Sequence, residues 1–461
     1  MVPTPCGEPL VDHHRRRCRC DSSPPRARSR SIETHRSDVG TAARMLLVLS
    51  RDGATIALLG VLTILGWALL ERLHRYSWRS MGGLYTLVVS GYVLSRFTLA
   101  ALYRTPEDTG IQPTVAIIVP AFNEGRAIVE TIEACCGVQY PVDKLEIVCV
   151  NDGSSDDTWA RMVAAASRSR RAVQCIDLPE NRGKRAALAT GIRATGAEIL
   201  VFVDSDSAPD PPAVGRIVQA FSDPRVGAVS GITYVRNAGD NLLTRIQAAR
   251  YFISYALLKA AESVVGAVTC CSGCFAAYRR DAVLPVLEAW EHQRFLGAAC
   301  TYGDDRSLTN QILRTGWRTR YHARAESWTK VPDEYATFFR QQLRWKKSWL
   351  REGLLLMGHI WRTRPIALPS IGIAALTGLL SPLILFWNFC WMPGHQGIFP
   401  VVYAMALYLV AMAYSLYYRS ARKDGLWLYA CLGTLFYLAF SAQLLWALAR
   451  VRDGSWGTRR V

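Results

Sequence analysis

Two aspartates, Asp204 and Asp206, stand one residue apart after the apolar run 199–203. A continuous apolar run with β-branched and aromatic residues predicts a strand buried on both faces of a parallel sheet. Open α/β sheets bind ligands beside the carboxyl ends of such strands. Two carboxylates there suit Mg²⁺ or Mn²⁺ on a diphosphate, because these ions prefer carboxylate and phosphate oxygens. The alternative is a plain Asx turn.

Other polar side chains follow other expected strands. Asn123 and Glu124 come after the first strand, and Asp152 comes after the second. A carboxylate such as Asp152 can accept hydrogen bonds from a base N–H or from ribose hydroxyls. Lys184 follows the third strand, where its charge can neutralise phosphates. These residues predict a nucleotide-binding edge.

Two further groups lie later in the chain. Asp304 and Asp305 stand at a helix entrance, where acidic residues are often simple caps. In a crevice that binds a metal diphosphate, one of them becomes a candidate general base for an acceptor hydroxyl. Gln341, Arg344 and Trp345 share one side of a helix by their i, i+3, i+4 spacing. The arginine can pair with phosphate, and the tryptophan offers a flat apolar face to a sugar ring.

Strands alternate with helical stretches from residue 113 to about 332. The expected strands are 115–119, 145–150, 173–178 and 199–203. Such alternation predicts βαβ units and a mostly parallel sheet. We therefore expect an α/β domain at 113–332 with its polar site at the carboxyl ends of the strands.

The composition limits the classes of partner that the chain is expected to bind. The chain has 461 residues, half of them hydrophobic, and a net charge of +17. Much of the basic excess lies at the N-terminus and around apolar segments, which favours a membrane surface over nucleic acid. We recognise no nucleic-acid-binding motif. The thirteen cysteines lack disulfide or zinc spacing, so we interpret them as reduced thiols.

The N-terminal part divides into two regions. Residues 1–44 are basic and rich in Ser and Pro, a disordered composition without the apolar core of a secretory signal. Met45 is an alternative start. Residues 45–112 hold two apolar stretches, 54–70 and 82–102, that we expect to cross a bilayer, with buried core helices as the alternative.

The C-terminal part divides into three regions. Residues 333–365 hold an amphipathic helix with a basic face beside an aromatic face, typical of a membrane interface or a polar groove. Residues 366–450 contain three apolar segments, 366–390, 398–417 and 426–448, each long enough to span. Residues 451–461 form the tail.

Taken in order, these motifs resemble those of the membrane-embedded processive family 2 glycosyltransferases that make cellulose, chitin and hyaluronan. The resemblance covers roughly residues 50–461. Its motifs are Asp152, Asp204-Ser-Asp206, Gly303-Asp-Asp305 and Gln341-x-x-Arg344-Trp345.

Three further motifs are similar to those of hyaluronan synthases: Cys270 to Arg280, Gly303 to Thr309, and Trp456 to Arg459. Cys274-Phe275 departs from the usual Pro-Leu pair. Chitin-oligosaccharide synthases share most of the other motifs, so the polymer remains open.

The resemblance implies a GT-A type, Rossmann-like nucleotide-sugar domain inserted between transmembrane helices. It also implies inverting transfer from UDP-sugar donors to a growing polysaccharide acceptor that is β-linked and exported across the lipid bilayer. The protein would be a multi-pass plasma-membrane enzyme with a cytoplasmic catalytic domain. The strongest alternatives are a synthase using UDP-GlcNAc alone and a non-processive transferase acting on a lipid carrier. The Gln341-x-x-Arg344-Trp345 helix argues against the latter.

The resemblance also implies residue roles. Asp152, with Asn123 and Glu124 nearby, would contact uridine, and Lys184 would help. Asp204 and Asp206 would hold Mg²⁺ or Mn²⁺, and Asp305, beside Asp304, would be the general base. Gln341, Arg344 and Trp345 would form the acceptor end of the site. Trp456 to Arg459 would close over bound UDP.

The gating role of the tail raises a problem of membrane topology. An even number of crossings should separate Gln341 from the Trp456 segment if both reach the cytoplasmic site. The sequence offers three apolar segments between them. We therefore expect one of the three to be interfacial or re-entrant.

Overall fold

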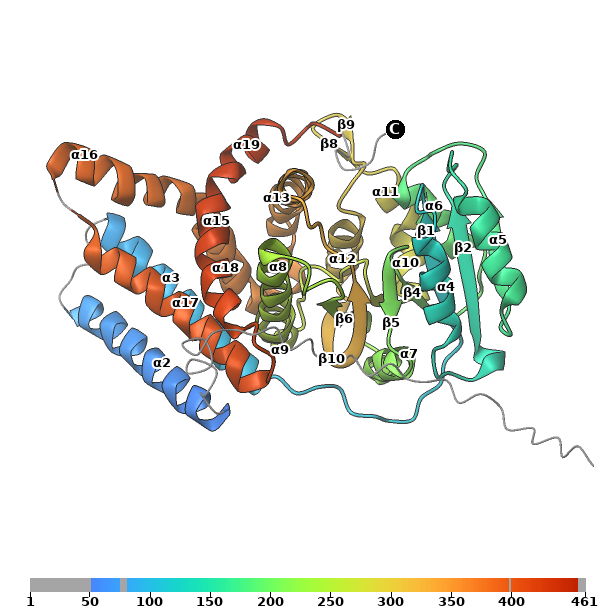
Figure 1. Cartoon of the computed structure of the whole chain (residues 1–461), viewed down its shortest axis with the longest axis horizontal. Helices are drawn as coiled ribbons and strands as arrows, with labels where there is room; N and C mark the ends of the chain where they lie inside the picture. The colour runs from blue at the N-terminus through green and yellow to red at the C-terminus, as the bar shows by residue number, and fades with distance from the viewer. Residues whose placement is uncertain (1–50, 75–80, 398, 455–461) are drawn as a thin grey trace, which may run out of the picture. The chain divides into compact units, whose positions relative to one another are not determined.

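The computed structural model describes residues 51–74, 81–397 and 399–454, all within a unit that spans residues 49–461 (Figure 1). The expected disordered N-terminus and the Trp456 to Arg459 segment lie outside the described residues.

An eight-stranded sheet forms the centre of the α/β part, in the order β3-β2-β1-β4-β7-β6-β10-β5. The strands are β1 (Val115–Ala121), β2 (Leu145–Asn151), β3 (Val173–Asp177), β4 (Ile199–Phe202), β5 (Ser207–Pro209), β6 (Val226–Val235), β7 (Ala276–Arg279) and β10 (Arg318–Thr329). A separate small ribbon pairs β8 (Arg294–Phe295) with β9 (Ala298–Ala299).

The sheet is mixed. Strands β1 to β4 are mutually parallel, as the sequence predicts. Strand β7 runs antiparallel to both β4 and β6, and β10 is parallel to β6. Because β7 is antiparallel to both of its neighbours, β4, β6 and β10 all point the same way. The central strands therefore share one carboxyl edge and one amino edge.

Helices cover both faces of the sheet. They are α4 (Ala127–Cys136), α5 (Thr158–Arg168), α6 (Lys184–Arg193), α7 (Ala213–Val218), α10 (Arg280–Val283), α11 (Leu287–Glu291) and α12 (Asp304–Arg314). Alternate residues of a strand face opposite sides. Ile117 accordingly packs in one core with Ile128 of α4, whereas Ile118 packs in the other with Leu188 of α6.

Two long helical stretches border the α/β part. The first is α8 (Leu242–Ile253), which continues through a π-helical turn, Ser254–Lys259, into α9 (Ala260–Val264). The second is α13 (Tyr335–Met357), the expected amphipathic helix, followed by α14 (Ile360–Thr363).

The remaining helices are apolar. They are α2 (Arg51–His74), α3 (Met81–Leu102), α15 (Leu368–Phe386), α16 (Met392–Gln396), α17 (Val401–Ala421), α18 (Trp427–Ala439) and α19 (Gln443–Ala449). By length and composition, four stretches of the described chain qualify as membrane spans: Arg51–Glu71, Pro365–Gln396, Val401–Ala421 and Trp427–Ala449. Leu87–Leu102 is a shorter apolar helix.

Helices α2, α3, α15 and α17 pack against one another. Arg51 Nε of α2 donates to Ser420 O of α17 at 2.8 Å. Tyr85 OH of α3 donates to Thr377 O of α15, and Phe97 of α3 stacks on Tyr414 of α17. These contacts join segments from opposite ends of the chain into one helical group.

The α18–α19 stretch packs against α17 near its start, and it also packs against α8 and α13 along its length (Figure 1). Near its start, Tyr429 OH accepts from Arg245 of α8 at 3.1 Å. Midway, Phe440 packs against Phe338 of α13. Further on, Gln443 Nε2 donates to Phe339 O of α13 at 2.9 Å. Both ends of α18–α19 therefore lie against helices that border the α/β part.

Candidate functional site

A lysine and two aspartates from three different elements meet at the carboxyl edge of the sheet. Lys184 opens α6, Asp204 follows β4, and Asp304 opens α12. The Lys184 Nζ atom lies 2.5 Å from Asp204 Oδ1 and 3.3 Å from Asp304 Oδ2. The chain thus brings together three charged residues that the sequence separates by up to 120 positions.

These charges stabilise one another. Burial alone would lower the pKa of Lys184, but the carboxylates of Asp204, Asp304 and Asp305 outweigh burial and raise it above its usual range. Burial alone would raise the pKa of Asp304, but Lys184 and Arg185 outweigh burial and lower it. Lys184 and Asp304 are therefore both charged at neutral pH.

A glycine lets the loop before β7 approach this charged group. A Cβ on Gly273 would stand 3.0 Å from Asp204 Oδ1 and 3.1 Å from Lys184 Nζ. Any side chain at this position would crowd the ion pair. The lack of space beside the ion pair therefore explains why a glycine stands in the Cys270 to Cys274 stretch.

Asp206 lies next to the end of β10. Its Oδ1 atom accepts from Thr329 Oγ1 and from Ser207 Oγ, each at 3.3 Å. The pairing of Thr329 with Ser207 in the β10–β5 ladder places Thr329 there. Asp204 and Asp206 therefore bind different protein partners, and both side chains remain partly exposed.

Asp152 holds the loop that leads to Lys184. Its two carboxylate oxygens accept from the backbone N–H groups of Arg182 and Gly183, each at 2.9 Å. Gly183 has a φ of 91°, which only glycine adopts readily. Asp152 thus has a positioning role that the sequence interpretation missed, and its predicted contact with uridine stays a prediction.

Asn123 ties the ends of β1 and β2 together. Its Oδ1 atom accepts from Ser155 N at 2.9 Å, and its own N–H donates to Ser154 Oγ at 3.0 Å. Beside it, the Glu124 N–H donates to Thr158 Oγ1 at 2.9 Å. Both predicted residues therefore lie at the same edge as Asp152, with the Asn123 side chain exposed.

Two hydrogen bonds, one to each oxygen, hold the Asp305 carboxylate. Its Oδ1 atom accepts from Arg306 N at 2.7 Å, and its Oδ2 atom accepts from Cys270 Sγ at 3.4 Å. Burial, and then the charge of Asp305, raise the pKa of Cys270 far above its usual range, so the thiol keeps its proton and donates. The sequence interpretation placed Cys270 in a motif similar to that of hyaluronan synthases and interpreted it as a reduced thiol, but it did not predict this contact with Asp305.

Helix α13 lies beside the Asp304 turn. Gly303 has a φ of 73°, and a Cβ there would overlap the side chain of Ser348 of α13. Trp345 is 42% exposed, and its ring lies 6.4 Å from that of Tyr251 of α8. Arg344 is partly exposed on the same helix. The predicted acceptor-end helix therefore contacts the turn that carries the candidate base.

Gln341 has a feature of its own. Its Oε1 atom is buried and has no hydrogen-bond partner among the described residues. Buried polar atoms in proteins usually find a partner. An acceptor left open in this way suits a ligand hydroxyl.

The last described residues, Asp453 and Gly454, contact the segment just before Asp304. Tyr302 OH donates to Asp453 O at 2.8 Å, and Lys347 Nζ of α13 donates to the same oxygen at 3.0 Å. Thr301 Oγ1 donates to Gly454 O. Because Tyr302 precedes Asp304 by two residues, the chain reaches the site just before the predicted tail motif. The sequence interpretation assigned Lys347 only to a basic helix face.

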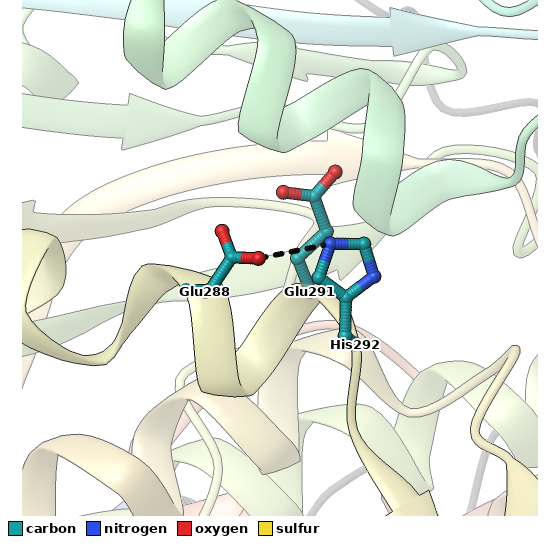
Figure 2. Close-up of side chains that lie close together, drawn as sticks. All are labelled: Glu288, Glu291 and His292. Carbon is teal, nitrogen blue, oxygen red and sulfur yellow. Dashed lines mark ion pairs between the residues drawn. The ribbon is translucent and has the colours of Figure 1, made fainter.

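A second group of titratable side chains lies on α11 (Figure 2). Glu288, Glu291 and His292 place their ligand atoms within 4.8 Å of one another. Arg193 Nη2 of α6 lies 2.6 Å from Glu291 Oε2 and 3.5 Å from Glu288 Oε2. The arginine bridges both carboxylates and offsets one of their two negative charges, so we interpret the group as a clamp between α6 and α11.

Sequence comparisons place this site among known proteins. The profile of the family described as "Glycosyltransferase like family 2" matches residues 113–348. A hyaluronan synthase of Streptococcus pyogenes serotype M3 is 29% identical over 386 residues, 82% of this chain and 91% of the relative. An N-acetylglucosaminyltransferase of Rhizobium meliloti is 35% identical over 298 residues, 64% of this chain and 68% of the relative.

A third relative and one solved structure complete the comparison. An N-acetylglucosaminyltransferase of Azorhizobium caulinodans is 37% identical over 248 residues, 54% of this chain and 62% of the relative. The mannosyltransferase PcManGT of Pyrobaculum calidifontis, in complex with GDP-Man and Mn²⁺, superposes with a TM-score of 0.56 at 23% identity. It covers 85% of this chain and 98% of that protein. The fold class predicted from the sequence is therefore confirmed.

Proposed function

Because the chain belongs to glycosyltransferase-like family 2, we propose that it polymerises UDP-activated sugars processively, with inversion, into an exported β-linked polysaccharide. The observation that carries this proposal is the meeting of Lys184, Asp204 and Asp304 at the sheet edge, beside the α13 helix. A nucleotide-sugar transferase needs charge for the diphosphate, a base, and an acceptor surface. These elements supply all three.

Hyaluronan, made from UDP-GlcNAc and UDP-GlcA, is the product we propose. The similarity to the streptococcal hyaluronan synthase extends over 82% of the chain, which includes much of the apolar helical part. An oligomer or polymer of N-acetylglucosamine made from UDP-GlcNAc alone is the second candidate. The rhizobial relatives favour it with 35% and 37% identity over shorter stretches.

At the donor end, uridine would lie beside the tips of β1 and β2. The Asp152 carboxylate lies at this place, and a carboxylate is the type of acceptor that suits a base N–H or ribose hydroxyls. The exposed Asn123 and the partly exposed Glu124 border the same place. Lys184 would lie against the diphosphate, where its positive charge favours the departing UDP.

Asp204 and Asp206 fit a divalent cation. They are two partly exposed carboxylates beside a strand end. Mg²⁺ and Mn²⁺ prefer such oxygens together with phosphate. When bound, the ion would neutralise charge that develops on the diphosphate. The Pyrobaculum neighbour was solved with Mn²⁺, which supports this choice.

The transfer itself would be a single displacement. Asp305 accepts the proton of the acceptor hydroxyl while that oxygen forms a bond to the anomeric carbon. The bond between this carbon and the diphosphate oxygen breaks on the opposite face, and UDP leaves with the electron pair. An α-linked donor then gives a β-linked product. Cys270 and the Arg306 N–H would hold the Asp305 carboxylate in position.

At the acceptor end, α13 would guide the polymer. Trp345 offers an exposed ring, Gln341 an open acceptor oxygen, and Arg344 a charge for the leaving diphosphate. The chain reaches the site again at Asp453 and Gly454. Trp456 and Arg459, a few residues further on, would close over bound UDP.

The packing of α18–α19 suggests an answer to the topology problem. We propose that α15–α16 and α17 cross the membrane outward and back, while α18–α19 lies at the interface against α8 and α13. Two crossings then separate Gln341 from the tail. UDP-sugars are cytoplasmic, so the α/β part would face the cytoplasm and the polymer would leave across the plasma membrane.

Product formation by purified enzyme tests the proposal. The enzyme would receive UDP-GlcNAc, UDP-GlcA or both, with Mg²⁺ or Mn²⁺ and in parallel with a chelator. Polymer only with both donors, digestible by hyaluronidase and lost on metal removal, supports a hyaluronan synthase. Product from UDP-GlcNAc alone favours the second candidate. No transfer from either donor, in protein that retains bound UDP, would contradict both.

A further inference from the structure

A basic cavity lies at the edge of the sheet opposite the catalytic site. It has a volume of about 450 Å³ and is lined by Arg225, Thr315, Gly316, Trp317, Arg318 and Arg364. Arg318 opens β10, and Arg225 directly precedes β6. Because β4, β6 and β10 point the same way, this amino edge lies on the order of 30 Å from the Asp204 edge, the length of a ten-residue strand.

The cavity carries excess positive charge. Among its lining residues in the described chain, three are arginines and none is acidic. The neighbouring Asp223 binds Arg225 at 2.9 and 3.1 Å and lies 3.5 Å from Arg318. One carboxylate against three guanidinium groups leaves two positive charges that invite an anion.

Arg364 is held at the cavity by the backbone of Gly316. Its Nη2 atom donates to Gly316 O at 2.8 Å, which holds the side chain over the start of β10. Its Nε atom is buried and has no hydrogen-bond partner among the described residues. Arginine forks match the oxygens of a phosphate group. A guanidinium group held at the cavity wall therefore suits a phosphate group bound in the cavity.

The cavity borders a membrane span. Arg364 directly precedes the apolar stretch Pro365–Gln396, which is long and apolar enough to cross a bilayer. Ile366 is 71% exposed and Trp361 is 50% exposed beside the same turn. A phosphate bound by the arginines would thus sit next to an apolar surface that acyl chains can cover. A soluble phosphate compound would leave that surface in water.

We propose that this cavity binds the phosphodiester of an anionic lipid headgroup, with Arg225, Arg318 and Arg364 as its ligands. Basic pockets at the ends of membrane helices recognise anionic headgroups through charge and fixed donors. The site lies outside the catalytic crevice, and lipid binding there does not depend on which sugars the enzyme polymerises.

Native mass spectrometry of the full-length protein in detergent tests this site. Short-chain phosphatidylglycerol would be titrated against short-chain phosphatidylcholine, and soluble glycerol phosphate would be titrated in parallel. The test variant is Arg225→Gln/Arg364→Gln. The matched control is Arg168→Gln/Arg170→Gln, which removes the same charge from two exposed arginines at the end of α5. A second variant, Arg225→Lys/Arg364→Lys, keeps the positive charges but removes the paired N–H donors of the guanidinium groups.

We expect one phosphatidylglycerol molecule to bind each chain in preference to phosphatidylcholine. The Gln variant should weaken this binding by roughly tenfold, the Lys variant by less, and the control not at all. Thermal unfolding and size-exclusion profiles would verify that the variants fold. Equal binding of both lipids, or an unchanged Gln variant, would overturn the proposal. Glycerol phosphate bound as tightly as the lipid would show a site for soluble phosphates instead.

Discussion

The two edges of the central sheet carry opposite charge. At the carboxyl edge, Asp204 and Asp304 share the cation Lys184, with Asp305 also close enough to influence it. At the amino edge, three arginines line a cavity beside the single carboxylate Asp223. The same sheet thus presents an acidic edge and a basic edge.

The difference shows two ways to bind phosphate. An acidic edge repels a diphosphate unless a divalent cation lies between them, so binding there can depend on metal. A basic edge needs no metal, because guanidinium groups contact phosphate oxygens directly. Metal-dependent binding suits a donor that must leave after each transfer. Direct binding by arginines suits a ligand that remains bound.

The largest expected effect concerns the candidate base at the acidic edge. Asp305→Asn keeps the shape but removes proton acceptance, so transfer should fall by roughly 10²- to 10⁴-fold. UDP binding should persist, because no step of binding requires this carboxylate. Radiolabelled polymer yield and UDP titration measure the two effects. Asp143→Asn, an exposed residue at the other edge, should change neither. A full polymer yield from Asp305→Asn would remove Asp305 from the mechanism.

The next effect concerns the cation of the acidic edge. Lys184→Gln leaves Asp204 and Asp304 without their shared charge partner and removes the donor that we propose for the diphosphate. Loss of one such donor typically costs about 10²-fold in rate. We expect a drop of that size, measured as kcat with saturating donor and metal. Lys144→Gln, a lysine at the amino end of β2, is the matched control. Wild-type kcat in Lys184→Gln would show that the lysine only stabilises the fold.

A smaller effect concerns Cys270, which donates to Asp305. A thiol is a weak donor, so Cys270→Ala should lower kcat by roughly threefold to tenfold and leave the KM for the donor unchanged. Cys270→Ser retains a donor and should restore most of the rate. This split between kcat and KM distinguishes a positioning role from a packing role. Equal losses in the Ala and Ser variants would indicate packing alone.

The last effect is one of stability rather than of rate, in the strand that joins the two edges. Burial, and then Arg216 and Arg324, lower the pKa of His322 of β10 from 6.5 to about 4. Between the pKa values of 6.5 and about 4, His322 is protonated in the unfolded chain but neutral in the folded chain. The free energy of unfolding therefore falls by about 3 kcal/mol as pH drops through this window.

The pH dependence of the melting temperature measures this contribution of His322 to stability. His322→Gln should flatten the dependence between pH 6.5 and 4, because the titrating group is gone. An unchanged slope in His322→Gln would assign the acid sensitivity to other groups.

The sequence by itself determined the strands and their acidic ends. Continuous apolar runs such as 199–203 can be stable only when buried on both faces, and polar residues end them at the ligand edge. The α/β fold, the family and the glycosyltransferase class were therefore predictable, and the comparisons confirm them. The roles of individual site residues, Trp456 and Arg459 included, stay predictions.

Only the tertiary structure decided which distant residues meet. The Lys184–Asp304 pair, the thiol at Asp305, the docking of α18–α19 and the arginine cavity each join segments far apart in the chain. Local spacing follows from helix and strand geometry, so a sequence reveals it directly. Long-range pairing follows from strand order and helix packing. Those depend on how all elements bury their apolar faces together, so no local pattern specifies them.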